Sequence, residues 1–215
     1  MNAPVFAPPS RLFSDYSRRL ACALDQLDWS PVERLAYELR DCWQTGRQVF
    51  FCGNGGSGGN ANHLANDYLY ALSKMPGSGL RVHSLVANPS VLTCLANDEG
   101  YEQVFSLQLA VLARPRDILI AFSGSGNSPN ILRALEEAKL RDMTSYAVLG
   151  FSGGKAMELA DVSIHVAIDD MQIAEDAQMI VGHMLLQWLY SQRDEVNATD
   201  YAADLRQTWR RMKNS

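Results

Sequence analysis

The sequence has little of several features that would place it in a specialised class of protein. It contains four cysteines and no CxxC pair, so it has neither the spacing of a zinc ribbon nor that of a disulfide-rich scaffold. Lys and Arg number 19 against 24 Asp and Glu, and the formal net charge of -5 argues against a broad nucleic-acid-binding face. We find no internal repeat and no low-complexity tract.

A secretion signal and a long apolar run are also missing. The N-terminus has no basic start followed by an apolar stretch, and no run reaches the ~20 apolar residues that span a bilayer. The spacing of the cysteines is that of reduced, mostly buried thiols. We therefore expect a cytoplasmic protein with no membrane-spanning segment and no nucleic-acid partner.

Hydrophobic residues make up 47% of the 215 residues, which is enough for one substantial core. We expect a loose, proline-rich N-terminus over residues 1–9 and a single domain over residues 10–215. Apolar residues at helical spacing predict two early and two late helices, over residues 11–27, 31–45, 172–192 and 200–212.

Between these helices, short strand-like runs alternate with helical segments. Strands are expected over residues 48–52, 80–86, 117–122, 145–149 and 162–168. Such alternation implies right-handed crossovers and a mainly parallel sheet covered by helices on both faces, an α/β architecture. In such open sheets the ligand binds beyond the carboxyl ends of the strands.

Two loops rich in glycine and serine follow two of these predicted strands. The first comprises Gly53, Asn54, Gly55, Gly56 and Ser57, and the second runs from Ser123 to Ser128 with the sequence SGSGNS. Glycine lets the backbone approach a ligand, while hydroxyls and the unpaired amides of a helix start favour an anion. Together the loops predict a site for a phosphorylated small molecule.

The two common nucleotide-binding motifs fit these glycine loops less well. Gly53, Gly55 and Gly58 match the GxGxxG pattern of dinucleotide-binding proteins, but the second strand ends near Asn88 without the required carboxylate. A Walker loop needs Lys-Ser or Lys-Thr after the glycines, and neither loop has it. A plain tight turn stays open for either loop alone, although two matched loops at strand ends disfavour it.

Histidines and carboxylates supply candidate catalytic and metal-binding positions. His63 and Asp67 are four residues apart in the helix predicted after the first loop, so their side chains share a face and can approach one ion or substrate. Glu175 and His183 would complete an oxygen and nitrogen set that zinc accepts. Eight residues rise ~12 Å, however, so both reach one ion only with an irregular helix start or donors from different subunits.

Each of these residues also has a plainer interpretation. His63 alone is typical of a hydrogen-bonded surface histidine, and His183, in an apolar stretch, is typical of a core histidine. Asp98, after Asn97, is typical of a helix-ending turn. His83 and His165 lie inside predicted strands, and we assign them to structure.

Taken together, the motifs resemble the sugar isomerase (SIS) domain family. The resemblance covers roughly residues 13–190, and its marks are both loops, His63, the Asn97-Asp98 pair, Gly153-Gly154-Lys155 and His183. It implies a flavodoxin-like three-layer sandwich with a five-stranded sheet and N-terminal helices, usually assembled as a homotetramer. It also implies substrate contacts at Asn54, Ser57, Asp98, Ser123, Ser125 and Ser128, with Gly55, Gly56, Asn97 and Gly124 in the same motifs.

The resemblance further implies isomerisation of a seven-carbon sugar phosphate, sedoheptulose 7-phosphate, for surface-glycan synthesis. Asp67 is expected as the base, His183 as the acid, and zinc as the metal held by His63, Asp67, Glu175 and His183. The family has glutamate at the position of Asp67 and glutamine at that of Glu175. In this chain the first carboxylate is therefore one methylene shorter, and a second carboxylate replaces an amide. A non-catalytic relative that binds the replication initiator, or a sugar-phosphate sensor, stays open.

Overall fold

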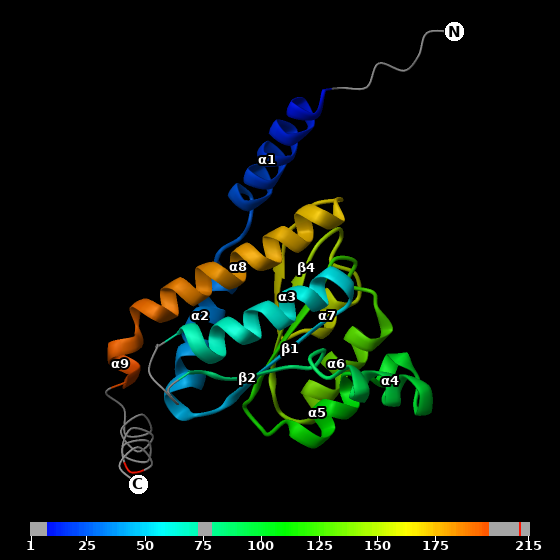
Figure 1. Cartoon of the computed structure of the whole chain (residues 1–215), viewed down its shortest axis with the longest axis vertical. Helices are drawn as coiled ribbons and strands as arrows, with labels where there is room; N and C mark the ends of the chain where they lie inside the picture. The colour runs from blue at the N-terminus through cyan, green and yellow to red at the C-terminus, as the bar shows by residue number, and fades with distance from the viewer. Residues whose placement is uncertain (1–7, 73–78, 198–210, 212–215) are drawn as a thin grey trace.

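The computed structural model describes residues 8–72, 79–197 and 211, and its centre is a five-stranded sheet (Figure 1). The sheet order is β2-β1-β3-β4-β5, and every described neighbouring pair is parallel. The strands are β1 (Gln48–Gly53), β2 (Arg81–Ser84), β3 (Ile118–Ser123), β4 (Thr144–Leu149) and β5 (Val162–His165). This confirms the predicted α/β class and the five-stranded flavodoxin-like sheet.

Helices connect the strands and flank both faces of the sheet (Figure 1). The α-helices are α1 (Pro9–Asp25), α2 (Ser30–Thr45), α3 (Gly55–Asn66), α4 (Pro89–Asp98), α5 (Ser106–Leu112), α6 (Pro129–Leu140), α7 (Ala156–Leu159), α8 (Met171–Ser191) and α9 (Arg193–Asn197). A π-helix, η1 (Asp67–Ala71), continues α3, and a 3-10 turn, η2 (Tyr101–Gln103), follows α4. No described helix is long and apolar enough to cross a membrane.

Two hydrophobic clusters fill the space between the sheet and its two helical layers. Alternate residues of a strand point to opposite faces, so Phe51 and Ile120 join the cluster under α2, α3 and α8. Their neighbours Phe50 and Leu119 join the cluster under α5, α6 and α7. Both faces of β1, β3 and β4 are therefore buried, which explains the nearly continuous apolar runs of these central strands.

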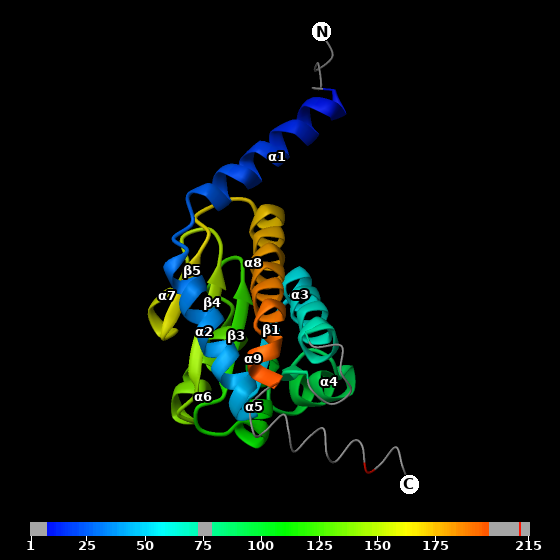
Figure 2. The same cartoon turned by 90° about the vertical axis from the view of Figure 1, so that its left-hand side faces the viewer.

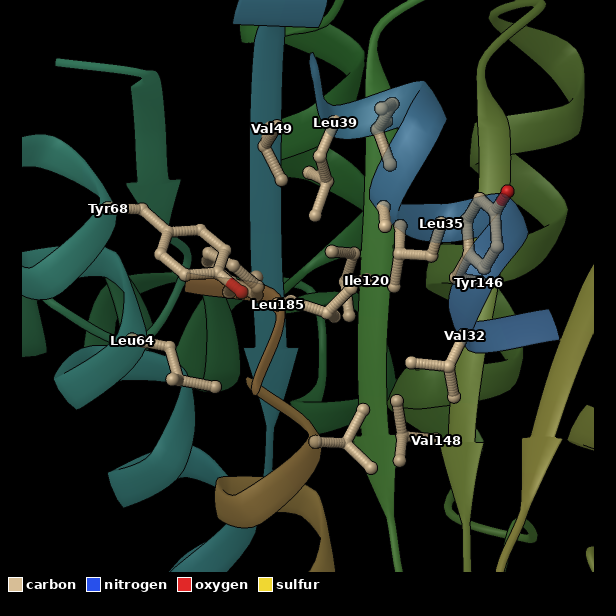
Figure 3. Packing of buried hydrophobic residues seen from close by; sticks show 14 of the residues in the cluster. Val32, Leu35, Leu39, Val49, Leu64, Tyr68, Ile120, Tyr146, Val148 and Leu185 are labelled. Atoms are coloured by element: carbon tan, nitrogen blue, oxygen red, sulfur yellow. The ribbon is translucent and has the colours of Figure 1, made fainter. Parts of the chain in front are cut away.

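The first cluster positions the helices that carry the candidate site. Leu35 of α2 and Leu185 of α8 pack over Ile120 in the middle of the sheet (Figure 3). Leu35 is completely buried, and burial of a leucine side chain contributes about 1.5–3 kcal/mol. Leu35→Ala would therefore loosen α2 and cost about 2–5 kcal/mol, because a cavity adds to the lost burial.

Helix α1 extends away from the body of the molecule (Figures 1 and 2). None of its residues, all of which the structure describes, is buried. The Tyr16 hydroxyl donates to Asp176 at 2.6 Å, and Arg19 pairs with Asp170, so α1 is attached to the first turns of α8. Residues 1–7 and nearly all of the predicted helix over residues 200–212 lie outside the described residues.

Candidate functional site

The two glycine loops lie side by side at the carboxyl edge of the sheet. Strands β1 and β3 are parallel neighbours, with Gly53 in register with Phe122, so the chain leaves both strands at the same edge. A single residue, Asn54, separates β1 from α3. Gly55 then adopts φ 53°, in the left-handed region where glycine is favoured. This sharp turn brings Gly55 and Ser57, in the first turn of α3, to the same cavity as the second loop.

A reciprocal pair of side-chain amides joins the first loop to α6, the helix that follows the second loop. The Asn54 Nδ2 donates to Asn130 Oδ1, and the Asn130 Nδ2 donates to Asn54 Oδ1, both at 2.8 Å. Asn130 lies in the first turn of α6 and is only 1% exposed. The hydroxyl of Tyr101 also donates to Asn54 Oδ1, at 2.9 Å. The Asn54 side chain thus connects the first loop to the start of α6 and to η2.

A polar pocket of about 230 Å³ opens between the loops and the start of α8. It is lined by Asn54, Gly55, Ser57, Phe122, Ser123, Gly124, Ser125, Ser128, Met171 and Glu175. Eight of the ten substrate-binding residues predicted from the sequence belong to the two loops, and seven of those eight line this pocket. The eighth, Gly56, is the neighbour of two lining residues.

The serines of the second loop give the pocket its hydrogen-bonding groups. Ser123 Oγ accepts from the Gly126 amide at 3.0 Å, and Ser125 Oγ accepts from the Asn127 amide at 3.3 Å. In both bonds the hydroxyl accepts, so its own O–H can donate to a ligand oxygen. Ser128 stands at the N-cap position of α6 and makes no side-chain capping bond. Hydroxyl and amide donors converging on one cavity suit a phosphate.

His63, Asp67 and His183 form a second polar group where α3 passes into η1 beside α8. Their donor atoms lie within 4.8 Å of one another. His63 Nε2 is 3.1 Å from His183 Nε2 and 3.3 Å from Asp67 Oδ2, and His183 Nε2 is 3.6 Å from the same oxygen. The two histidine side chains are 50% and 41% exposed, so a ligand can reach them.

These distances fit a tetrahedral metal ion. Donors at the usual zinc distances of ~2.0–2.2 Å lie about 3.3 Å apart along each edge of a tetrahedron. The three observed separations between donor atoms, 3.1, 3.3 and 3.6 Å, are close to the edge lengths of one triangular face of that tetrahedron. Two imidazoles and one carboxylate leave a fourth position open, as in catalytic rather than structural zinc sites.

Close packing of α3 on α8 brings this group together. A Cβ atom on Gly182 would overlap the Leu64 side chain, so glycine permits the helices to approach. The Tyr68 hydroxyl donates to the Gly182 carbonyl at 2.8 Å and fixes the two helices along their axes. His63 and His183, which flank this contact, therefore face each other although they are far apart in the sequence.

Glu175 lies outside the group formed by His63, Asp67 and His183. Its carboxylate touches Gly56, where a Cβ atom would overlap it, and it forms part of the polar pocket wall. The Glu175 carbonyl accepts from Asn60 Nδ2 at 2.8 Å, which holds this part of α8 against α3. Because α8 is regular from Met171, the ~12 Å rise to His183 separates the two side chains.

Asn97 and Asp98 lie at the exposed end of α4 and do not line the pocket. Asn97 Nδ2 donates to Asp98 Oδ1 at 2.7 Å, and the Cys94 thiol donates to Asp98 Oδ2. These hydrogen bonds, the amide first, hold the pKa of Asp98 below its usual value. Within one chain, the segment that follows Asp98 contacts the first loop through the hydrogen bond from the Tyr101 hydroxyl to Asn54 Oδ1.

Three residues at the site, Asn130, Tyr101 and Met171, are not predicted by the sequence motifs. Asn130 follows Pro129 at the start of α6, a position typical of helix initiation, so the sequence offers no sign of its contact with Asn54. Tyr101 and Met171 belong to segments whose approach to the loops depends on the tertiary fold. His83 and His165, assigned to structure, contact Gln48 and the Phe151 carbonyl.

The sequence and the fold of this chain both match proteins of one known family. A family model described as SIS domain matches residues 13–150, well over half of the chain. The chain belongs to the SIS-domain family. Its matches include a phosphoheptose isomerase from Nitratidesulfovibrio vulgaris, 35% identical over 158 residues that cover 73% of this chain and 74% of the relative.

Two further matches cover more of this SIS protein. A phosphoheptose isomerase from Shewanella denitrificans is 34% identical over 182 residues, which cover 81% of this chain and 91% of the relative. A solved phosphoheptose isomerase structure from Francisella tularensis has a TM-score of 0.78 at 27% identity and covers 85% of this chain and 96% of that one. The SIS fold and the resemblance predicted from the motifs are thus confirmed.

Proposed function

We propose that this SIS protein is an aldose–ketose isomerase that interconverts sedoheptulose 7-phosphate and D-glycero-D-manno-heptose 7-phosphate. The observation that carries the proposal is the presence of a serine-lined pocket of about 230 Å³ and of a His, His and Asp group along the same stretch of α3, η1 and α8. The two alternatives, binding of a replication initiator and sensing of a sugar phosphate, are not favoured, because the relatives are isomerases.

The spacing of the two groups supports a seven-carbon substrate. Gly56, beside the pocket, and His63 are seven residues apart, so they lie on one face of α3 and about 10 Å apart along its axis. Eight bonds separate the phosphorus from C1 of a 7-phosphate, and an extended chain covers about 1.2 Å per bond, or about 10 Å. A phosphate in the pocket therefore lets the reacting carbons approach His63, Asp67 and His183.

The chain's own residues take distinct roles in this proposal. Serines of the second loop and the first amides of α3 hold the phosphate and fix the sugar, which converts binding energy into orientation. Asp67 takes the proton from one of the two adjacent carbons, and its conjugate acid returns a proton to the other. His183 Nε2 belongs to the group that would hold the metal, so the proton that moves between the two oxygens as the carbonyl becomes a hydroxyl passes between those oxygens directly or through water.

We further propose zinc as the resident metal, held by His63, Asp67 and His183. When bound, it would polarise the substrate oxygens and stabilise negative charge on them. The sequence placed Glu175 in the same set, and its position at the pocket wall supports a contact with the sugar phosphate rather than with the ion.

Deuterium incorporation tests the reaction directly. Metal-replete protein incubated with sedoheptulose 7-phosphate in deuterated water should label C1 or C2 of the product, as read by NMR and mass spectrometry. Asp67→Asn should lose at least about 100-fold of the labelling rate, since the base is removed. Asp194→Asn, an equal change at an exposed position of α9, should label at the wild-type rate. No label from wild-type protein would refute the proposal.

We also propose a homotetramer that works in the cytoplasm and supplies heptose for surface glycans. Helix α1, whose residues are all at least partly exposed, and a groove lined by Trp29, Tyr37, Met184 and Trp188 support association between copies. Exposed apolar surface of this kind is typical of an interface. Light scattering coupled to size-exclusion chromatography tests it, and a monomer of 23.8 kDa at micromolar concentration would refute it.

A further inference from the structure

The polar pocket beside the two loops carries a negative charge, although its proposed ligand is an anion. Among the described residues that line it there is no lysine or arginine, and its one charged side chain is Glu175. The proposed ligand carries negative charge, so the amides and hydroxyls that attract it act against a carboxylate in the same wall. A pocket built only to hold phosphate has no use for this group, because like charges repel at short range.

Glu175 is held in this place by its surroundings. Its side chain rests on Gly56, at the first turn of α3, where any larger residue would displace it. Its backbone carbonyl accepts from Asn60, and Asn60 Nδ2 also approaches Gln178 Oε1 at 3.2 Å. The carboxylate therefore lies in the same pocket wall as the serines and beside Gly56, which precedes His63 by seven residues on α3.

A carboxylate accepts hydrogen bonds and donates none, so it suits a chain of hydroxyl groups. We propose that Glu175 is a specificity-determining residue that makes the pocket reject simple phosphates and accept phosphate esters bearing hydroxylated chains. Its charge weakens binding of any phosphate, and only a ligand whose hydroxyls donate to Glu175 recovers the loss. The choice of a sugar as the hydroxylated ligand rests on the proposed function.

Binding measurements on metal-loaded protein separate the repulsion of phosphate by Glu175 from the hydrogen bonding of ligand hydroxyls to Glu175. Titration calorimetry at constant ionic strength would compare methyl phosphate, which has the charged group and no hydroxyl, with sedoheptulose 7-phosphate. Glu175→Gln keeps the size of the side chain and removes its charge. Glu136→Gln, on the exposed face of α6, makes the same change in net charge away from the pocket.

Glu175→Gln should bind methyl phosphate about three- to tenfold more tightly, as expected for removing one like charge at roughly 6 Å in a water-like dielectric. The preference for the sugar phosphate over methyl phosphate should fall at least as much, and Glu136→Gln should change neither. Unchanged methyl phosphate affinity in Glu175→Gln would overturn the inference. Loss of bound zinc from Glu175→Ala, measured by elemental analysis, would also overturn it, because Glu175 would then be a metal ligand.

The same titrations distinguish failure of this inference from failure of the proposed function. If wild-type protein bound sedoheptulose 7-phosphate no better than methyl phosphate, the proposed substrate would be wrong. The change in methyl phosphate affinity in Glu175→Gln would still decide whether the charge of Glu175 opposes phosphate binding. If Glu175→Gln kept the wild-type preference between the two ligands, the role of Glu175 in selecting hydroxylated chains would be overturned.

Discussion

The Nε2 atoms of His63 and His183 lie 3.1 Å apart, although the residues are 120 positions apart in the sequence. Neutral imidazole has one lone pair on an unprotonated ring nitrogen, so two such atoms face each other stably only with a shared proton or a shared cation. Asp67 Oδ2, 3.3 and 3.6 Å from the same two atoms, adds negative charge that favours a cation.

We therefore expect wild-type protein to bind about one zinc ion per chain. His63→Ala and His183→Ala should each lower zinc affinity by at least about 100-fold, because three protein donors become two. His83→Ala should keep the metal, since His83 lies in β2 with Gln48 as its partner. Elemental analysis after dialysis against a weak chelator gives the stoichiometry, and zinc retained by both site variants would contradict the prediction.

Lengthening Asp67 should impair the enzyme even though it restores the family's glutamate. The Asp67 carboxylate already lies within 3.6 Å of both imidazoles, and a further methylene would carry it about 1 Å past them. We expect Asp67→Glu to lower kcat/KM by about 10- to 100-fold, a loss typical of misplacement on this scale. Steady-state kinetics of metal-loaded protein measures it, and a faster Asp67→Glu enzyme would show that the site is not adjusted to aspartate.

Two glycines of α3 offer a matched pair of substitutions. A Cβ atom at Gly56 would overlap the Glu175 carboxylate, whereas one at Gly59 would meet nothing within 4 Å. Gly59→Ala should raise stability by about 0.5–1 kcal/mol through helix propensity and leave activity unchanged. Gly56→Ala should displace Glu175 and lower kcat/KM by about 10-fold or more. Equal activities of the two variants would show that the position of Glu175 does not matter.

The reciprocal amides of Asn54 and Asn130 should be energetically coupled. Removing either side chain leaves polar atoms of the other without partners, and Asn130 is almost fully buried, so each alanine variant should cost about 1–3 kcal/mol of unfolding free energy. The double variant should cost less than the sum by about 0.5–3 kcal/mol. Urea unfolding of the four proteins gives the coupling, and strict additivity would exclude it.

Acid should weaken the start of α8. The amide of Ile173 donates to Asp170, and this bond, followed by the one from Arg19, holds the pKa of Asp170 below 3.8. The ionised carboxylate thus favours the folded state above about pH 4, and its contribution is lost as pH falls through the lower folded value. Asp170→Asn can still cap the helix but cannot titrate. Denaturant unfolding from about pH 2 to pH 7 should show a shallower acid dependence for Asp170→Asn than for wild type.

The sequence by itself determined the features that depend on neighbouring residues. Strand runs followed by Gly53-Asn54-Gly55 and by Ser123-Gly124-Ser125 predicted turns into helix starts, because glycine conformation and helix-end amides are local properties. Alternation of these units predicted the parallel sheet, and a parallel sheet puts both turns at one edge. The i, i+4 spacing likewise predicted that His63 and Asp67 share a face, as they do.

Only the tertiary structure decided which distant groups meet. The approach of α8 to α3 at Gly182 sets His183 opposite His63, and it also turns Glu175 toward Gly56 and away from them. The link between Asn54 and Asn130 likewise depends on the register of β1 with β3. Such contacts follow from packing between helices and strands far apart in the chain, and side-chain spacing within a single element carries no information about them.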